Sequence, residues 1–256
     1  ENTALGFVAG FTGEEIVRRI EQMGVRADLI RISNGISRIN VKLQSIDGTE
    51  INGCGPQISE RHVQELLEKL DILGAGDVLI LAGSIPSSMP DDMYRRIMER
   101  LEGRGVMIAV DATRDLLVNV LAYHPFLVKP NNHELGEIFG AELKTREEVI
   151  PYAKKMQEMG AVNVLVSMAG EGAVLAAGDG SIHAAPAPEG RLINGVGAGD
   201  SMVAGFLAGW MEQKDYSHAF AMGIAAGSAS AFSEQLATKE EVEAVYRQVR
   251  KQQADE

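Results

Sequence analysis

Four short, largely apolar runs alternate with amphipathic segments along this chain, and the alternation limits the folds open to it. The runs are Asp77–Ala82, Val106–Val110, Pro125–Val128 and Val162–Val166. Apolar runs of this length are typical of strands that are buried on both faces. A hairpin is expected after the last run, over Ala173–Ala184. Because apolar residues recur at helical spacing between the runs, the sequence predicts a mostly parallel sheet with helices on both faces, a three-layer α/β/α fold.

One region departs from this alternation. Residues 28–53 have strand character without a helical pattern, and Asn34-Gly35 and Asp47-Gly48 are typical hairpin turns. We therefore expect a small antiparallel sheet over 28–53, inserted into an α/β core made of residues 1–27 and 54–256. A sheet of this size is not stable alone, so it should cover an active site or contact a second subunit.

The composition restricts the class of partner. The 256 residues carry a formal net charge of −12 and are 45% hydrophobic. An acidic chain is a poor candidate for binding nucleic acid or an anionic membrane surface, and the sequence has no apolar run long enough to span a bilayer. Cys54 is the single cysteine, which excludes a disulfide framework and fits a cytoplasmic, reducing environment.

The segment Gly195–Ser201 places three glycines around Asp200, and an apolar helical pattern follows directly. A glycine-rich turn before a helix exposes backbone amides where the helix dipole favours an anion. A carboxylate at this position fits a base that takes a proton from a nucleophile attacking a bound phosphoryl group. The alternative is that Asp200 simply caps the helix. The spacing alone does not separate the two interpretations.

A second polar cluster, Lys129-Pro130-Asn131-Asn132-His133-Glu134, follows a predicted strand. Ligands of open α/β sheets bind at the carboxyl ends of the strands. Asn131 and Glu134 could hold a hydrated Mg²⁺ there, because this ion keeps most of its water ligands, and Lys129 would supply a cation near phosphates. The alternative, which the residues alone favour, is that Asn131 caps a helix and Glu134 lies at its positive end.

Three further groups of residues are weaker candidates for ligand binding, because they lie at this predicted edge of the sheet or face it. Residues 167–172 form a glycine-rich loop that could approach a nucleotide phosphate, although an ordinary turn is the simpler interpretation. Ser84 follows a buried strand, so its hydroxyl should point toward the crevice. Arg38 and Lys42 lie on one face of the predicted insert, where they could receive a sugar phosphate or simply meet solvent.

Together these motifs resemble those of the ribokinase-like, PfkB-type sugar kinases. Residues 192–201 resemble the family's C-terminal signature, and Lys129-Pro130-Asn131-x-x-Glu134 resembles its magnesium-associated motif. The resemblance extends over essentially the whole chain and is most detailed for members that phosphorylate fructose 1-phosphate. The further matching segments are residues 6–13, 38–42, 49–56, 83–86 and 226–233.

The resemblance implies ATP-dependent phosphoryl transfer. By this resemblance, Asp200 removes the proton of the sugar hydroxyl, and Asn131 and Glu134 act on Mg²⁺ through water. The amides that would bind the transferring phosphoryl group are those of Gly197, Ala198 and Gly199.

The resemblance also implies where the two substrates bind. The residues that would line the path of the ATP phosphates are Lys129, Ser167 and Gly172, and those near the adenine are Gly227 and Ser228. The residues that would meet the phosphosugar are Arg38, Lys42 and Ser84. The inserted sheet would be a lid over the sugar, and in related kinases it also forms the contact of a homodimer.

One departure from the family pattern lies at the start of the chain. Family members begin with a further strand that carries a sugar-binding Asp, followed by a Gly-Gly-Lys-Gly turn, and these 256 residues contain neither. We therefore expect the sequence to begin inside a domain. If the segment is absent from the molecule itself, sugar binding should be poor and stability reduced.

The expected reaction is phosphorylation of fructose 1-phosphate at its 6-hydroxyl, giving fructose 1,6-bisphosphate. The nearest alternative substrate is tagatose 6-phosphate. The resemblance of the residues Arg38-Ile39-Asn40-Val41-Lys42 favours fructose 1-phosphate over it. A different class of function, a non-catalytic nucleotide-binding protein, is disfavoured because Asp200, Asn131 and Glu134 are all present, and a binding module needs no base.

Overall fold

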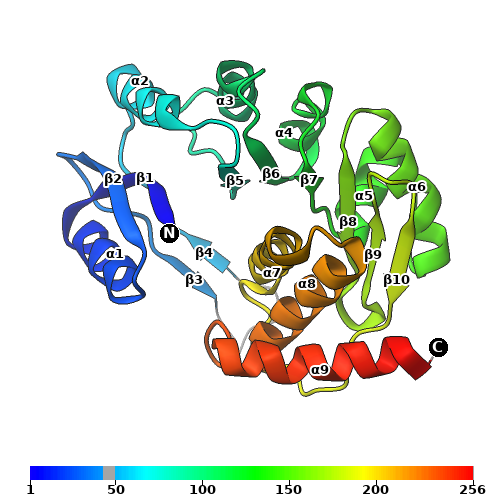
Figure 1. The fold of residues 1–256 in the computed structure, drawn as a ribbon. Coiled ribbons are helices and arrows are strands. Elements are labelled where there is room, and N and C mark those ends of the chain that lie inside the picture. Colours follow the sequence, from blue (N-terminus) through cyan, green and yellow to red (C-terminus); the bar gives the residue numbers. More distant parts are fainter. Residues whose placement is uncertain (43–49, 256) are drawn as a thin grey trace. The chain divides into compact units, whose positions relative to one another are not determined.

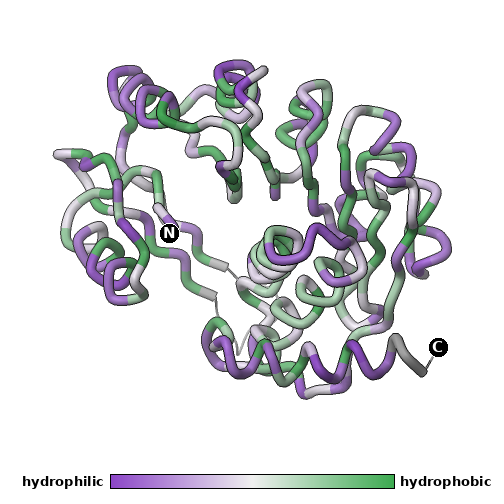
Figure 2. Tube along the Cα trace, viewed as in Figure 1, coloured by the Kyte–Doolittle hydropathy of each residue, from purple (hydrophilic) through white to green (hydrophobic). Residues whose placement is uncertain are grey.

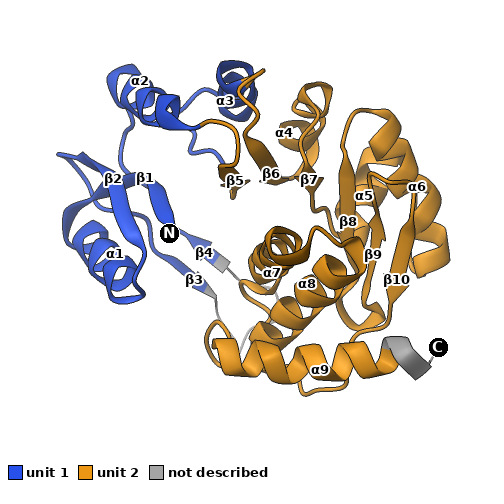
Figure 3. Cartoon of the chain, in the orientation of Figure 1, with its two compact units in different colours: residues 1–73, 85–101 blue, residues 74–84, 102–256 orange. Residues whose placement is uncertain are grey.

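The computed structural model describes residues 1–42 and 50–255. It consists of two compact units, which Figure 3 shows in different colours. Unit 1 contains residues 1–73 and 85–101, and unit 2 contains residues 74–84 and 102–256. The predicted insert, residues 28–53, belongs to unit 1 as far as it is described.

Unit 1 begins with a strand–helix–strand element: β1 (Thr3–Ala9), α1 (Gly10–Gln22) and β2 (Arg26–Ile32). The two strands pair in parallel, from Thr3 opposite Arg26 to Ala9 opposite Ile32. The prediction that the segment from Asp28 to Ile32 joins an antiparallel sheet was therefore wrong. Helix α1 carries the chain back to the start of β1, so that β2 runs in the same direction as β1 and Asn34-Gly35 does not join paired strands.

The later part of the predicted insert forms the expected antiparallel pair where it is described. Residues 33–39 are not in a strand, so Arg38 precedes β3 and does not share a strand face with Lys42 as predicted. Strands β3 (Asn40–Lys42) and β4 (Glu50–Asn52) pair antiparallel, with Asn40 opposite Asn52. The predicted turn at Asp47-Gly48 lies outside the described residues.

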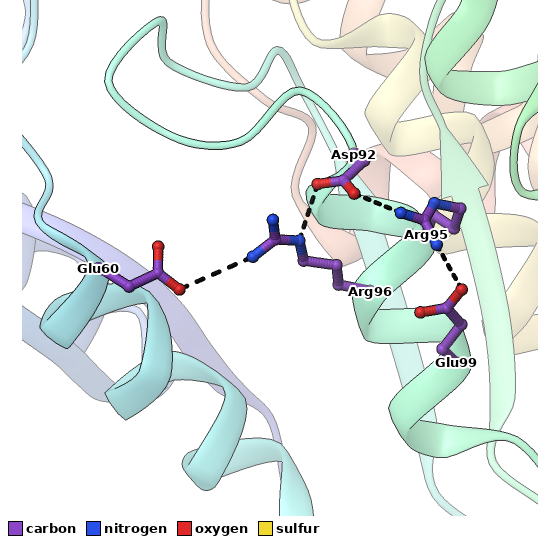
Figure 4. Close-up of polar contacts among 5 residues, drawn as sticks. All are labelled: Glu60, Asp92, Arg95, Arg96 and Glu99. Carbon is purple, nitrogen blue, oxygen red and sulfur yellow. Dashed lines mark hydrogen bonds and ion pairs between the residues drawn. The ribbon is translucent and has the colours of Figure 1, made fainter.

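Two helices complete unit 1, α2 (Glu60–Lys69), which continues into η1 (Leu70–Ile72), and α3 (Met93–Leu101). Figure 4 shows polar contacts at the start of α3, one of which reaches α2. Arg96 of α3 lies 3.7 Å from Oε1 of Glu60 on α2 and donates to Oδ1 of Asp92 at 2.8 Å. Asp92 also pairs with Arg95, which reaches Glu99 one turn further along. These half-exposed pairs hold the start of α3 and connect it to α2.

Unit 2 is built on the predicted sheet. Its strands are β5 (Val78–Ala82), β6 (Met107–Asp111), β7 (Leu127–Val128), β8 (Asn163–Ser167), β9 (Ala173–Ala176) and β10 (Ile182–Ala185). The order is β10-β9-β8-β7-β6-β5. Strands β5 to β8 are parallel, whereas β9 and β10 form the expected hairpin and run antiparallel.

Helices cover both faces of this sheet, as predicted, and Figure 1 shows α7 and α8 on one face and α5 and α6 on the other. The unit's helices are α4 (Arg114–Val118), η2 (Leu121–Tyr123), α5 (Asn132–Phe139), α6 (Arg146–Glu158), η3 (Ala169–Glu171), α7 (Ala198–Gln213), α8 (Tyr216–Ala231) and α9 (Lys239–Asp255). In the core, Leu165 of the sheet packs with Phe206 of α7 and Phe220 of α8, all fully buried. Figure 2 shows the contrast between these apolar elements and the largely hydrophilic α9.

Candidate active site

The parallel strands of unit 2 bring four polar residues to one edge of the sheet. Because β5 to β8 run in the same direction, their carboxyl ends meet at this edge. Asp111 ends β6, Lys129 directly follows β7, and Ser167 ends β8. Ser84, which is exposed, follows β5 by one residue, where the amide of Gly83 donates to the carbonyl of Asp111 at 3.3 Å.

Lys129 and Asp111 form a buried ion pair at this edge. The Lys129 side chain is only 7% exposed, and its Nζ lies 3.3 Å from Oδ1 of Asp111. Burial raises the pKa of Asp111 above its usual value, and the neighbouring ammonium group of Lys129 opposes that shift. The negative charges of Asp200 and Glu134 raise the pKa further. The carboxyl group of Asp111 thus lies within the electrostatic reach of one cation, Lys129, and of two further carboxylates.

The glycine-rich turn leads into α7 as predicted. Gly197 precedes the helix with φ +79°, a left-handed conformation that favours glycine. Asp200 falls in the first turn of α7 and is exposed. The amide of Ala198 donates to the carbonyl of Gly195 at 3.3 Å, a long bond within the turn. The first amides of a helix have no partner within the helix, which makes this end suited to an anion.

Lys129 also reaches the start of α7. A Cβ atom built on Gly199 would lie 3.1 Å from Nζ of Lys129. The absence of a side chain at Gly199 therefore lets the ammonium group lie against the helix N-terminus. The structure thus brings the glycine turn and the cluster at residues 129–134 together, although 61 or more positions separate them in the sequence.

Asn131 and Glu134 form the cap that the simpler interpretation expects. Oδ1 of Asn131 accepts from the amide of Glu134 at 2.8 Å, and Oε2 of Glu134 accepts from the amide of Asn131 at 2.8 Å. This capping box starts α5 directly after β7. It also fixes both side chains at the edge of the sheet, beside Lys129.

The loop after β8 closes on itself. The amide of Met168 donates to the carbonyl of Gly172 at 2.9 Å, and a bridge pairs Ser167 with Asn131. The loop therefore begins next to the capping box of α5. On α8, Gly227 is buried against the first turn of α7, because its Cβ would lie 3.0 Å from the carbonyl of Ala198, and Ser228 is half-buried.

Two predicted phosphosugar residues belong to unit 1. Arg38 is exposed and lies between β2 and β3, and Lys42 is the last residue of β3. Their expected role, like that of Ser84 in unit 2, stays a prediction.

Sequence reasoning missed Asp111. The residue follows the apolar run Val106–Val110 directly, and a single carboxylate at the carboxyl end of a buried strand is the signal that could have identified it. Its partner Lys129 was recognised from its own motif, but nothing in the spacing of the two residues indicates that they form an ion pair.

A model of the pfkB family of carbohydrate kinases matches residues 1–242. The chain belongs to this family. The kinase is 46% identical over 247 residues to a 1-phosphofructokinase of Bacillus subtilis, a match that covers 96% of this chain and 81% of that protein. It is 35% identical over 237 residues to a D-tagatose-1-phosphate kinase of Bacillus licheniformis, a match that covers 92% of this chain and 77% of that protein.

The fold of the kinase is also that of known structures. A crystal structure from Staphylococcus aureus, provisionally named a phosphofructokinase, superposes with a TM-score of 0.87 at 37% identity, covering 97% of this chain and 80% of the other. The ribokinase-like fold expected from the sequence is thus confirmed, and the protein is a sugar-phosphate kinase. None of the helices in residues 1–42 and 50–255 is long and apolar enough to cross a membrane.

Proposed function

We propose that the kinase transfers the γ-phosphoryl group of ATP to the 6-hydroxyl of fructose 1-phosphate, giving fructose 1,6-bisphosphate. The observation that supports this most is the placement of Asp200. It is an exposed carboxylate in the first turn of α7, beside a buried lysine and a glycine turn. The names of the similar proteins favour a ketose 1-phosphate as the acceptor.

In this proposal the chain's own groups position and polarise the reactants. Asp200 accepts the proton of the sugar hydroxyl as the hydroxyl oxygen attacks the γ-phosphorus of ATP, and the bond from that phosphorus to the bridging oxygen breaks to release ADP. The amides of Gly197, Ala198 and Gly199 and the ammonium group of Lys129 stabilise the charge on the transferring phosphoryl group. For the amide of Ala198 to take part, it must release or share its long bond to Gly195.

The residues present fit the Mg²⁺ that accompanies ATP. Among the residues that the structure describes, no cluster of His, Cys, Asp or Glu could hold a metal ion alone. Mg²⁺ does not need such a cage, because it binds through one or two carboxylates, water and the substrate phosphates. Asn131 and Glu134 would hold it through water, and it would neutralise phosphate charge when bound.

The remaining contacts of the substrates complete the proposal. ATP phosphates pass Ser167 and Gly172, and the adenine lies near Gly227 and Ser228. The phosphosugar is bound by Arg38, Lys42 and Ser84. We further propose a cytoplasmic location, which suits the exposed free thiol of Cys54.

The antiparallel strands of unit 1 are the proposed contact of a homodimer. Val41 and Ile51 of these strands, and Ile36 and Ile39 in the segment just before β3, have apolar side chains that are exposed to between 42% and 58%. Apolar side chains gathered on so small a sheet favour burial against a partner. A second copy of the chain fits, because the same strands would meet in a two-fold contact.

A second candidate substrate is D-tagatose 1-phosphate, which the name of the relative at 35% identity favours. Tagatose 6-phosphate is the third candidate substrate, because the sequence motifs also resemble those of kinases that act on it. Measuring kcat/KM for the three sugar phosphates with MgATP separates them, since fructose 1-phosphate should give the highest value. A higher value for either tagatose phosphate would overturn the substrate assignment. Nucleotide binding without turnover of any sugar phosphate would instead support the non-catalytic alternative.

A further inference from the structure

A chain of hydrogen bonds ties the first turn of α7 to the segment that follows α8. The amide of Ala237 donates to Oγ of Ser230 at 3.1 Å, and Oγ of Ser230 donates to Oγ of Ser201 at 2.9 Å. Ser230 is the next-to-last residue of α8 and is only 3% exposed. Ser201 directly follows Asp200. The residue beside the proposed base is therefore held by a buried side chain from another helix.

The Ser230 hydroxyl acts in this chain both as an acceptor and, through its single O–H, as a donor. Substitution by alanine removes both bonds at once. The amide of Ala237 and the hydroxyl of Ser201, which belong to half-buried residues, would each lose this partner, which is unfavourable to the extent that these polar groups are buried. The turn and the first turn of α7 would then be free to shift relative to α8.

The preceding part of the glycine turn is held to the same segment by other bonds. The amides of Ile193 and Asn194 both donate to the carbonyl of Ala231, at 2.9 and 3.1 Å. The side-chain amide of Asn194 donates to the carbonyl of Glu234 at 3.2 Å. Ser230 adds the contact nearest to Asp200, because its bond reaches Ser201 inside α7 rather than the loop before it.

We propose that Ser230 is a positioning residue for phosphoryl transfer, which acts through Ser201 to fix the helix turn that carries Asp200. The proposal rests on the proposed function of that turn. Ser230 itself touches neither the base nor the glycine amides in the contacts described. Its effect should fall on the rate of transfer more than on substrate binding, because a displacement of about 1 Å in a reacting group can cost up to about a hundredfold in rate.

Two measurements on Ser230→Ala test the proposal, and one of them does not depend on activity. The first is hydrogen exchange of the Ser201 amide by NMR, since this amide donates to the carbonyl of Gly197 at 2.9 Å. We expect exchange about tenfold faster or more than in the unaltered protein, because the turn loses its tie to α8. The second is kcat with MgATP and fructose 1-phosphate, which should fall about tenfold or more while KM for the sugar changes less than about twofold.

Ser233→Ala is the matched control. Oγ of Ser233 donates to the carbonyl of Ala229 at 2.9 Å, so this variant removes a hydroxyl from the same helix end without the bond to Ser201. It should keep the exchange of the Ser201 amide and kcat within about twofold of the unaltered protein. Ser201→Ala and the double variant with Ser230→Ala complete a cycle, in which the two losses in kcat should not add, because they break the same bond.

Unchanged exchange of the Ser201 amide in Ser230→Ala would overturn the proposal, as would equal effects of Ser230→Ala and Ser233→Ala on kcat. Failure of the proposed function gives a different result. In that case Asp200→Asn retains turnover, or fructose 1-phosphate is not phosphorylated, while the exchange of the Ser201 amide still rises in Ser230→Ala.

Discussion

The ammonium group of Lys129 lies 3.3 Å from Oδ1 of Asp111, in a position where the Lys129 side chain is almost fully buried. Burial raises the pKa of Asp111, and Lys129 is the group that opposes the shift. Ionising Asp111 in the folded protein therefore costs free energy. An aspartate ordinarily has a pKa near 3.8. As the pH rises from that value through the raised pKa of the folded protein, the contribution of Asp111 to the free energy of unfolding decreases.

Lys129→Met should raise the pKa of Asp111 further, because methionine keeps a long apolar side chain but removes the opposing charge. A ¹³C NMR titration of the carboxyl groups measures this directly. Asp179 provides an internal reference, since its pKa is lowered by hydrogen bonds from Ser181 and should not respond. An Asp111 carboxyl that titrates at its ordinary value in both proteins would contradict the account of the ion pair.

Gly199→Ala should lower kcat while leaving the fold intact. The new Cβ would lie 3.1 Å from Nζ of Lys129 and 3.4 Å from its Cε, so the lysine side chain must move away from the start of α7. Stability should change little, since alanine favours a helix by about 0.5–1 kcal/mol over glycine and offsets the crowding. We expect a loss of about tenfold in kcat from the displaced cation.

Gly195→Ala is the comparison for this variant, because a Cβ at Gly195 would meet no atom within 4 Å. It changes the same turn without crowding Lys129, so its loss of kcat should be clearly smaller. Equal losses in the two variants would mean that the approach of Lys129 to the helix has no part in the reaction.

Asp92→Asn should destabilise unit 1 in a pH-dependent manner. Burial raises the pKa of Asp92, but its hydrogen bonds and ion pairs with Arg95 and Arg96 outweigh this and lower it overall. The stabilisation is therefore present at neutral pH and is lost as the pH falls below about 3.8 through the lowered pKa. Because the pairs are partly exposed, we expect only about 0.2–1 kcal/mol.

Thermal unfolding of Asp92→Asn and the unaltered protein, from about pH 7 down to about pH 3, measures this difference. The two melting temperatures should converge at the acidic end. Asp91→Asn, at the exposed neighbouring position, should change the melting temperature less at every pH. A constant difference between Asp92→Asn and the unaltered protein across the range would contradict the ion-pair explanation.

The sequence predicted the architecture of unit 2 well because its signals are local. Continuous apolar runs identified β5 to β8, and the turn Gly178-Asp179-Gly180 lies between the two strands of the hairpin, β9 and β10. The cap at Asn131 was also visible as a short pattern. Each of these features depends on residues a few positions apart, which periodicity and spacing can show.

The features that sequence reasoning did not reach depend on pairs of distant residues. Strand β2 alternates as an antiparallel strand can, and only its pairing with β1 across α1 determines its direction. The ion pair of Lys129 with Asp111 joins two strand ends, and the contact of Lys129 with Gly199 joins two motifs. Which strand ends become neighbours follows from the strand order, and no local pattern encodes that order.

The central claim is that Asp200 is the base of the reaction, and the kcat of Asp200→Asn with MgATP and fructose 1-phosphate tests it most directly. Asp200 is exposed, so the variant should fold and melt like the unaltered protein. If Asp200 accepts the proton of the sugar hydroxyl, kcat should fall by about a hundredfold to ten-thousandfold. A folded Asp200→Asn variant with kcat within about tenfold of the unaltered protein would contradict the account.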